Sequence, residues 1–403
     1  MPGHRPILGN EAGLTILGSG VIKIRESLTI ADKVLRGVSI NDPDRAKRVN
    51  VVYRHEAIHY LQTYMTAFVF AHCEEVRGLS AKTALWLSDK SRDFNKLDEL
   101  RDSLTSLEDE MRKPTGHAPC APDGVSALQL MEAAAVIESL RSLTDITYAQ
   151  VLQEISADTD GDVTYTGVLK VAERNLGAEA TVRLVPTLVF IALNTEVPGE
   201  TFSTMLARLA DRDSREVASL RPQDMFDEFM RDRSGTLISA FAKGQRPSKS
   251  PFWNDVGVAF GSSGDLDLLH LIAANPSSLL SESNWSKQLD QDSLANCSPV
   301  LAIYEDGRGK LMGAGKDWAA SQVTTLLVVT EILGVMYRIG LQRNYEVFCR
   351  HLDCPDRASA LCHMAYPPAP SPDGDWKECP FRDRFKKLTG DWPAEFAKKC
   401  GIT

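Results

Sequence analysis

The clearest periodic pattern of apolar residues in the chain predicts a helix over residues 46–77. No Gly or Pro interrupts this stretch, and Asp42 and Pro43 before it suit a helix cap and a first helical position. Apolar residues recur there mostly at three- and four-residue steps, which is typical of a helix packed in a core: Val51, Ile58, Leu61, Met65 and Phe68. We therefore expect one long helix from Ala46 to Arg77.

Shorter patterns surround this helix. Three β-branched stretches precede it and favour a small sheet, with Gly18 and Gly20 as turn residues: Leu14–Leu17, Val21–Ile24 and Leu28–Ile30. A charged helical stretch, a Pro- and Gly-rich loop and a second amphipathic helix follow it: Ala81–Lys113, Lys113–Gly124 and Val125–Arg141. The chain to about residue 343 is mostly helix-like, whereas Tyr366–Asp375 is rich in Pro, Asp and Gly and is expected to be irregular.

Composition adds limits on the class of protein. The 403 residues are 43% hydrophobic and 25% charged, which is typical of a globular protein and not of a disordered chain. A net charge of −9 argues against a protein that coats nucleic acid, because phosphate binding requires a basic surface. We expect no nucleic-acid partner.

We also expect no membrane segment and a cytoplasmic location. Charged residues interrupt the apolar stretches of the first thirty residues, so no signal peptide is indicated. The apolar stretch Thr324–Gly340 contains Glu331 and Arg338 and is interpreted as a buried helix. Eight cysteines in a chain without a secretory signal favour reduced thiols.

The residues with the clearest chemistry are His55, Glu56 and His59, an HExxH motif inside the best-predicted helix. Histidines four residues apart lie on one helical face, one turn apart, so both rings can bind one metal ion. The neighbouring Glu56 is placed to take a proton from a metal-bound water. The alternative is a structural pair of core histidines, but two imidazoles and a carboxylate beside an apolar stripe are costly to bury without such a partner.

A third ligand is expected, and Glu132 is the preferred candidate. Gln62 and Met65 occupy the positions where a metzincin has Gly and His, which excludes that subclass. Glu74 and Glu75 lie about 22 Å along the same predicted helix. Glu132 is followed by three alanines, which permit close approach to the HExxH helix.

Glu138 is the competing carboxylate on the same predicted helix as Glu132. Six helical residues separate the two directions by about 240°, so only one of these carboxylates can face a given metal. Glu138 is interpreted as a surface residue, because Arg141 follows it by three positions. For Glu132 the alternative is an exposed helix charge.

The segment His55–Gln62 (HEAIHYLQ), followed by Glu132 in EAAA, resembles the gluzincin type of zincin metallopeptidase. The resemblance covers about residues 14–141 and implies Zn²⁺ bound by His55, His59 and Glu132, with a water at the open position. It implies that Glu56 is the general base, that the substrate is a peptide or protein, and that a strand within residues 21–30 lines the cleft. Gln62 becomes a candidate partner of a metal-binding histidine. A transition-state donor is not identified among Tyr148, Tyr165, His117 and the arginines.

The expected fold class is therefore α+β and predominantly α-helical, in three parts. Residues 1–160 would form the zincin-like metal-binding core with its small sheet, 161–345 a helical domain, and 346–403 a Cys-rich tail. Four cysteines in the tail, with two histidines among them, provide ligands for a second Zn²⁺ or an iron-sulfur cluster: Cys349, Cys354, Cys362 and Cys379. Their spacing is not that of paired CxxC motifs, so plain thiols remain the alternative.

Two other functions stay open on sequence alone. Two histidines and one carboxylate also describe a non-haem iron oxygenase acting on a peptide or small molecule. Glu56 favours zinc hydrolysis over this alternative, because an oxygenase does not require a base beside the metal. A metal-binding regulatory protein is the third interpretation, disfavoured because the motif residues are intact.

Overall fold

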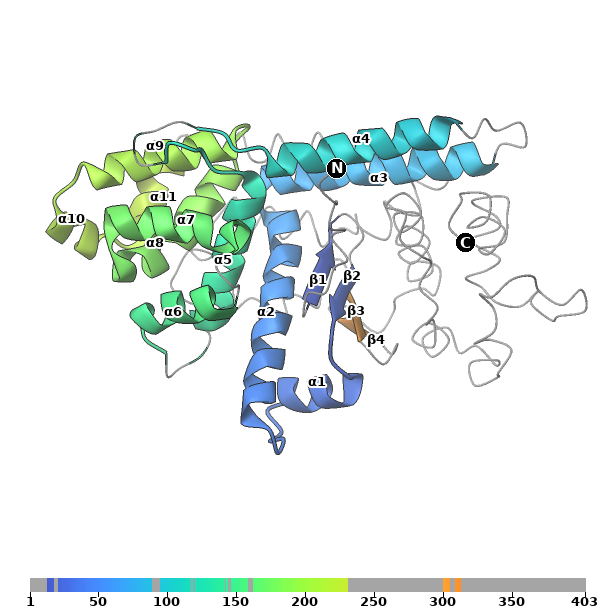
Figure 1. The fold of residues 1–403 in the computed structure, drawn as a ribbon, viewed down its shortest axis with the longest axis horizontal. Helices are drawn as coiled ribbons and strands as arrows, with labels where there is room; N and C mark the ends of the chain where they lie inside the picture. The colour runs from blue at the N-terminus through green and yellow to red at the C-terminus, as the bar shows by residue number, and fades with distance from the viewer. Residues whose placement is uncertain are drawn as a thin grey trace, which may run out of the picture.

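A computed structural model describes ten segments of the chain, to which all structural statements below refer: residues 13–17, 21–88, 95–116, 119, 121–141, 143, 146–158, 162–230, 300–304 and 309–312. Most of these residues are helical, as predicted (Figure 1). The elements are β1 (Gly13–Ile16), β2 (Val21–Ile24), α1 (Leu28–Leu35), α2 (Pro43–Met65), α3 (Ala67–Ser88), α4 (Asn95–Arg112), α5 (Ala127–Arg141), α6 (Tyr148–Asp158), α7 (Val163–Leu176), α8 (Ala178–Leu193), α9 (Pro198–Ala210), α10 (Ser214–Ser219), α11 (Pro222–Met230), β3 (Val300–Tyr304) and β4 (Gly309–Met312).

The four strands form one sheet in the order β1-β2-β3-β4. β1 and β2 are antiparallel neighbours, β2 pairs parallel with β3, and β3 pairs antiparallel with β4. The parallel pair joins residues 21–24 to residues 301–304, which are far apart in the sequence. Strands β3 and β4 therefore belong with the N-terminal strands, although they lie in the segment predicted as a helical domain.

The stretch Leu28–Ile30, predicted as a strand, is instead the first turn of α1. Ser27 has an extended backbone and its side chain accepts a hydrogen bond from the backbone N–H of Ile30, at 3.4 Å. This bond satisfies one of the donors that a helix start leaves free. The cap outweighs the strand tendency of the β-branched residues that follow it.

The predicted single helix over 46–77 is wrong, because the chain turns at Thr66 between α2 and α3. Asp42 caps α2 and Pro43 is its first residue, as predicted. Thr66 is fully buried and extended, and its hydroxyl donates to the carbonyl of Gln62 at 2.7 Å. The backbone N–H of Phe70 then bonds to the carbonyl of Thr66, which starts α3. In Figure 1, α3 runs across the end of α2 and lies beside α4.

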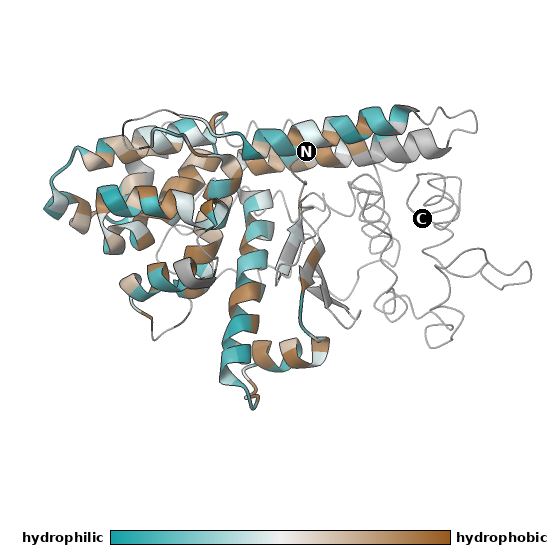
Figure 2. Ribbon diagram, in the orientation of Figure 1, coloured by the Kyte–Doolittle hydropathy of each residue, from teal (hydrophilic) through white to brown (hydrophobic). Residues whose placement is uncertain are grey.

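The hydrophobic core is continuous from the first strands to α11. Helix α8 is buried along most of its length and packs against α5, α7, α9 and α11. Figure 2 shows hydrophobic residues frequent in these helices, whereas α2 alternates between polar and apolar positions. One cluster of buried side chains includes members on both sides of residue 160. The helices of residues 162–230 therefore have no core separate from that of α5.

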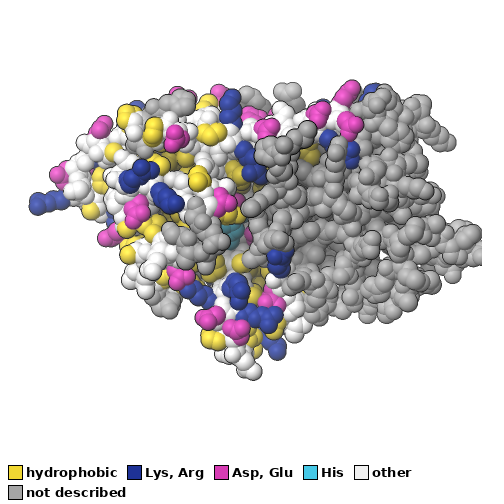
Figure 3. Space-filling view, viewed as in Figure 1, with side chains coloured by type: hydrophobic (Ala, Val, Ile, Leu, Met, Phe, Trp, Pro, Cys, Tyr) yellow, Lys and Arg dark blue, Asp and Glu magenta, His cyan; other side chains and the backbone are white. Residues whose placement is uncertain are grey.

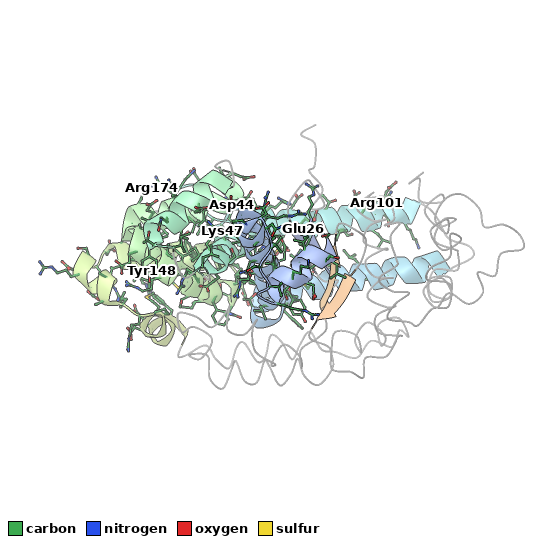
Figure 4. The ribbon with its side chains drawn as sticks, turned by 90° about the horizontal axis from the view of Figure 1, so that it is seen from below. Glu26, Asp44, Lys47, Arg101, Tyr148 and Arg174 are labelled. Carbon is green, nitrogen blue, oxygen red and sulfur yellow. The ribbon has the colours of Figure 1, made fainter. Side chains whose placement is uncertain are left out.

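A bidentate ion pair joins the start of α2 to the bend between β2 and α1. The guanidinium of Arg45 donates to both carboxylate oxygens of Glu26, each at 2.7 Å. Glu26 is 8% exposed and also accepts from the backbone N–H of Ser27, so it orients the chain into α1. Figure 4 shows Glu26 beside the first turns of α2, near Asp44 and Lys47.

Several predicted segments lie outside the described residues. They include the loops near 244–250 and 261–264, the apolar stretch 324–340 and the whole Cys-rich tail. Among the described residues, no helix combines the length and apolar character needed to cross a bilayer. On the face drawn in Figure 3, the Lys and Arg side chains of the described helices are interspersed with Asp and Glu.

We expect Glu26→Gln to lower the free energy of unfolding at neutral pH by about 1–2 kcal/mol, because it removes a charged hydrogen-bonding partner of Arg45. The hydrogen bond from Arg45 holds the pKa of Glu26 below its ordinary value of 4.5. A depressed pKa stabilises the folded state above the unfolded-state value, and this contribution is lost as the pH falls through the folded-state pKa. Urea unfolding should therefore show the difference at pH 7 and a smaller one at pH 3.

The matched control is Glu154→Gln. Glu154 pairs with Lys47 at 3.5 Å and both side chains are at least 40% exposed, so its change should stay within about 0.5 kcal/mol. An equal loss for Glu26→Gln at both pH values would contradict the role given to its charge.

Candidate metal centre

Helices α2 and α5 bring three ligand atoms together at one point. His55 and His59 project from the same face of α2, one turn apart, and Glu132 projects from α5. The two Nε2 atoms are 3.0 Å apart, and Oε2 of Glu132 is 3.1 Å from Nε2 of His55 and 3.3 Å from that of His59. The structure thus groups the three residues that the sequence proposed as ligands.

The spacing of these atoms fits a metal ion. In a tetrahedral Zn²⁺ site with bonds of about 2.0–2.1 Å, neighbouring ligand atoms lie about 3.3 Å apart. Oxygen and imidazole nitrogen are both ligands that Zn²⁺ and Fe²⁺ accept. Each ligand side chain is largely buried, with exposed fractions of 16% for His55, 8% for His59 and 13% for Glu132. None of the three side chains is completely buried, so solvent reaches part of the site.

Gln62 fixes the orientation of His59. Its Oε1 lies 2.9 Å from Nδ1 of His59, while its Nε2 donates to the backbone carbonyl of Met131 at 3.0 Å. The second bond orients the amide with its oxygen toward the ring, so Nδ1 carries the proton and Nε2 keeps a lone pair for the metal. Gln62 is fully buried and links α2 to α5 beside the ligand it orients.

The electrostatics of the group depend on Glu132. Burial by itself lowers the pKa of His59, but the charge and hydrogen bond of Glu132 outweigh it and raise this pKa to about 9. Burial raises the pKa of Glu132, yet the charges and hydrogen bonds of His59 and His55 outweigh it and hold this pKa far below its usual range. A positive charge at this point is therefore favoured, whether a proton or a metal ion supplies it.

Glu56 lies next to the ligand group without belonging to it. It is 5% exposed, and burial raises the pKa of its carboxyl even though the charges of His55 and His59 oppose the shift. The hydroxyl of Thr15, on β1, donates to Oε2 of Glu56 at 2.8 Å. A carboxyl with a raised pKa beside two histidines has the properties of a proton acceptor and donor.

Glu138, the competing candidate, is not the surface residue that the sequence indicated. It is 3% exposed and accepts a hydrogen bond from Arg141 at 2.9 Å. Burial raises the pKa of its carboxyl, and Arg141 opposes the shift. It is not part of the three-residue group. The pair with Arg141 predicted from the spacing is present, but it is buried because α5 is enclosed by neighbouring helices.

One of the proposed transition-state donors lies near the ligands. The ring of Tyr165, on α7, is centred 6.4 Å from the ring of His55. Tyr148 is on α6, and His117 lies outside the described residues, as do Cys349, Cys354, Cys362 and Cys379. Among the candidates, Tyr165 is thus one that the fold places beside a ligand ring.

Sequence reasoning missed the strand residues that contact Glu56. The strand expected beside the HExxH helix was placed within residues 21–30, whereas the contacts to Glu56 come from β1. Nothing in the sequence distinguishes Thr15 from the other β-branched residues near it, and no pattern marks Gly13 as a contact of the HExxH helix. Sequence spacing gives no information on which strand lies against a distant helix, so neither residue was identifiable in advance.

Comparisons with known proteins assign no family: no family model, curated protein or solved structure matches the chain. The resemblance of HEAIHYLQ and EAAA to gluzincins therefore stays a prediction.

We expect Glu132→Gln to weaken zinc affinity by at least about a hundredfold, because it removes the charged ligand. Glu138→Gln should retain metal, since Glu138 pairs with Arg141 outside the group. Metal content per chain and competition with a chelator measure both. Loss of metal from the Glu138 variant with retention in the Glu132 variant would reverse the assignment.

Gln62→Leu should lower zinc affinity about 10- to 100-fold, because His59 loses the acceptor that fixes its ring and tautomer. The matched control is Gln129→Leu. Gln129 is on α5, and its side chain bonds to the backbone N–H of Ser126 and the backbone carbonyl of Val163. Equal affinities in the two variants would show that Gln62 acts only in packing.

Proposed function

We propose that this protein is a zinc-dependent peptidase that hydrolyses peptide bonds with Glu56 as general base. The observation that carries the proposal is the convergence of His55, His59 and Glu132 on one point beside a buried carboxyl with a raised pKa. Zn²⁺ held by these three residues would lower the pKa of a water and polarise a carbonyl group. A peptide or protein is the proposed substrate.

Each residue of the site has its own role in the proposed reaction. His55, His59 and Glu132 would hold the ion, and Gln62 keeps His59 in the tautomer that leaves a lone pair on Nε2. Glu56 accepts a proton from the attacking water as the water oxygen bonds to the carbonyl carbon. The same carboxyl then gives that proton to the leaving amide nitrogen as the C–N bond breaks. This cycle returns Glu56 to its ionised form.

The position of Glu56 supports hydrolysis over an iron oxygenase. An oxygenase with two histidines and a carboxylate needs open positions on the metal but no base beside it. Burying Glu56 at 5% exposure costs free energy, and only the hydrolytic assignment gives that carboxyl a function. Tyr165, near His55, is our candidate for a hydroxyl donor to the substrate carbonyl.

Two further proposals concern the location of the protein and its C-terminal cysteines. We propose a cytoplasmic location from cysteine usage, and a second Zn²⁺ or an iron-sulfur cluster at the tail cysteines. Both follow from the sequence alone.

We expect Glu56→Gln to lower hydrolysis by at least about a hundredfold while the metal stays bound, because the variant loses the base and keeps all three ligands. His55→Ala is the contrasting variant and should lose both metal and activity. The assay is turnover of a library of quenched fluorescent peptides by protein whose zinc content has been measured.

Retained turnover in the Glu56→Gln variant would contradict the role of Glu56. Iron in anaerobically purified protein, with turnover that requires oxygen, would favour the oxygenase instead.

A further inference from the structure

Strand β1 contacts the side chain and the backbone of Glu56 at the same time. The Thr15 hydroxyl lies 2.8 Å from Oε2 of Glu56 and 2.9 Å from its backbone carbonyl oxygen. These two contacts join an edge strand of the sheet to the middle of α2, 41 residues later in the chain. β1 is therefore attached to α2 at the residue proposed as the base.

Gly13 approaches the same carboxyl from two positions earlier in the strand. A Cβ at Gly13 would lie 2.6 Å from Oε1 of Glu56, 2.7 Å from its Cγ and 2.7 Å from Cγ1 of Val52. Real Cβ atoms do not come this close to other atoms, so a side chain at position 13 requires Glu56 or Val52 to move. Alternate residues of a strand share a face, which explains why Gly13 and Thr15 both meet α2.

The two oxygens of the Glu56 carboxyl are consequently in different surroundings. Oε2 shares the single hydroxyl proton of Thr15 with the backbone carbonyl oxygen of Glu56. Oε1 lies beside Gly13, at the place where a side chain at position 13 would stand. A hydrogen bond to one oxygen restricts rotation of the carboxylate, while its other oxygen remains able to accept a proton.

We propose that Thr15 and Gly13 are positioning residues for Glu56, with Thr15 anchoring Oε2 and Gly13 leaving room for Oε1 to accept the proton of the attacking water. The catalytic part of this inference rests on the proposed peptidase function. The anchoring part concerns the contact between Thr15 and Glu56, and it can be measured in metal-free protein. Strand β1 thereby helps to set the position of the proposed base, Glu56.

The first experiment compares Thr15→Val, which keeps the shape, with Thr15→Ser, which keeps the hydroxyl. In zinc-loaded protein, Thr15→Val should lower kcat about 10- to 100-fold with KM changed less than about twofold, because the base is misplaced and substrate contacts are kept. Thr15→Ser should restore kcat to within about threefold of the parent protein. Zinc content should be the same in all three proteins.

Thr181→Val is the matched control, because the hydroxyl of Thr181 on α8 is buried and has no hydrogen-bond partner among the described residues. It should leave kcat unchanged. Equal kcat in Thr15→Val and the parent protein would overturn the proposal, and so would an equal loss in the valine and serine variants.

The second experiment needs neither metal nor activity. Urea unfolding of metal-free protein gives the midpoint shift caused by Thr15→Val in the parent protein and in a Glu56→Ala background. The shift should be smaller in the Glu56→Ala background, because the contact of the hydroxyl with the carboxyl is then absent and only its contact with the backbone carbonyl of residue 56 remains. Equal shifts in the two backgrounds overturn the anchoring whatever the activity.

The two experiments separate failure of this proposal from failure of the proposed function. A zinc-loaded parent protein that cleaves no peptide in the library contradicts the peptidase assignment and the catalytic part. A coupled midpoint shift in the same protein would still establish that Thr15 anchors Glu56.

Discussion

The contact between α2 and α5 is the interaction on which the rest of the described structure depends. It encloses Glu132, whose buried charge has to be compensated, and the compensation comes from His55 and His59 on the facing helix. Gln62 closes the same contact by bonding both to His59 and to the backbone of α5. Separating the two helices would expose apolar surface and leave these polar groups without partners.

The hydrophobic helices act as a support for this contact. α7 and α8 pack against α5 on one side, and most of α8 is buried. Because buried apolar side chains are closely packed, α5 has little freedom to move its carboxylate away from α2. The large helical part of the protein thus contributes to the precision of a small site, and its packing explains why Glu138 is buried rather than exposed.

The sheet contacts α2 on a part of its surface that adjoins the α5 contact. β1 meets the face of α2 that carries Val52 and Glu56, whereas α5 meets the face that carries His59 and Gln62. Glu56 points about 100° away from His55 and about 60° away from His59, so the carboxyl can contact β1 while the histidines face Glu132. The HExxH spacing combines ligands and base in a single turn because of this geometry.

Local chemistry in the sequence determined much of the site. The four-residue spacing of His55 and His59 places both on one helical face, and Asp42 with Pro43 defines the start of that helix. The alanines after Glu132 indicated a close approach between helices, which the buried contact of α2 with α5 agrees with. These features were readable because each depends on residues within one or two helical turns.

Only the tertiary structure decided the features that depend on distant partners. No Gly or Pro marks the break between α2 and α3 at Thr66. It occurs where the buried hydroxyl of Thr66 bonds to a carbonyl of the preceding turn. The pairing of β2 with β3, and the contacts of Gly13 and Thr15 with Glu56, join residues far apart in the chain. Periodicity reports which face of an element is apolar, but not what packs against it, because that choice is set by the free energy of the whole core.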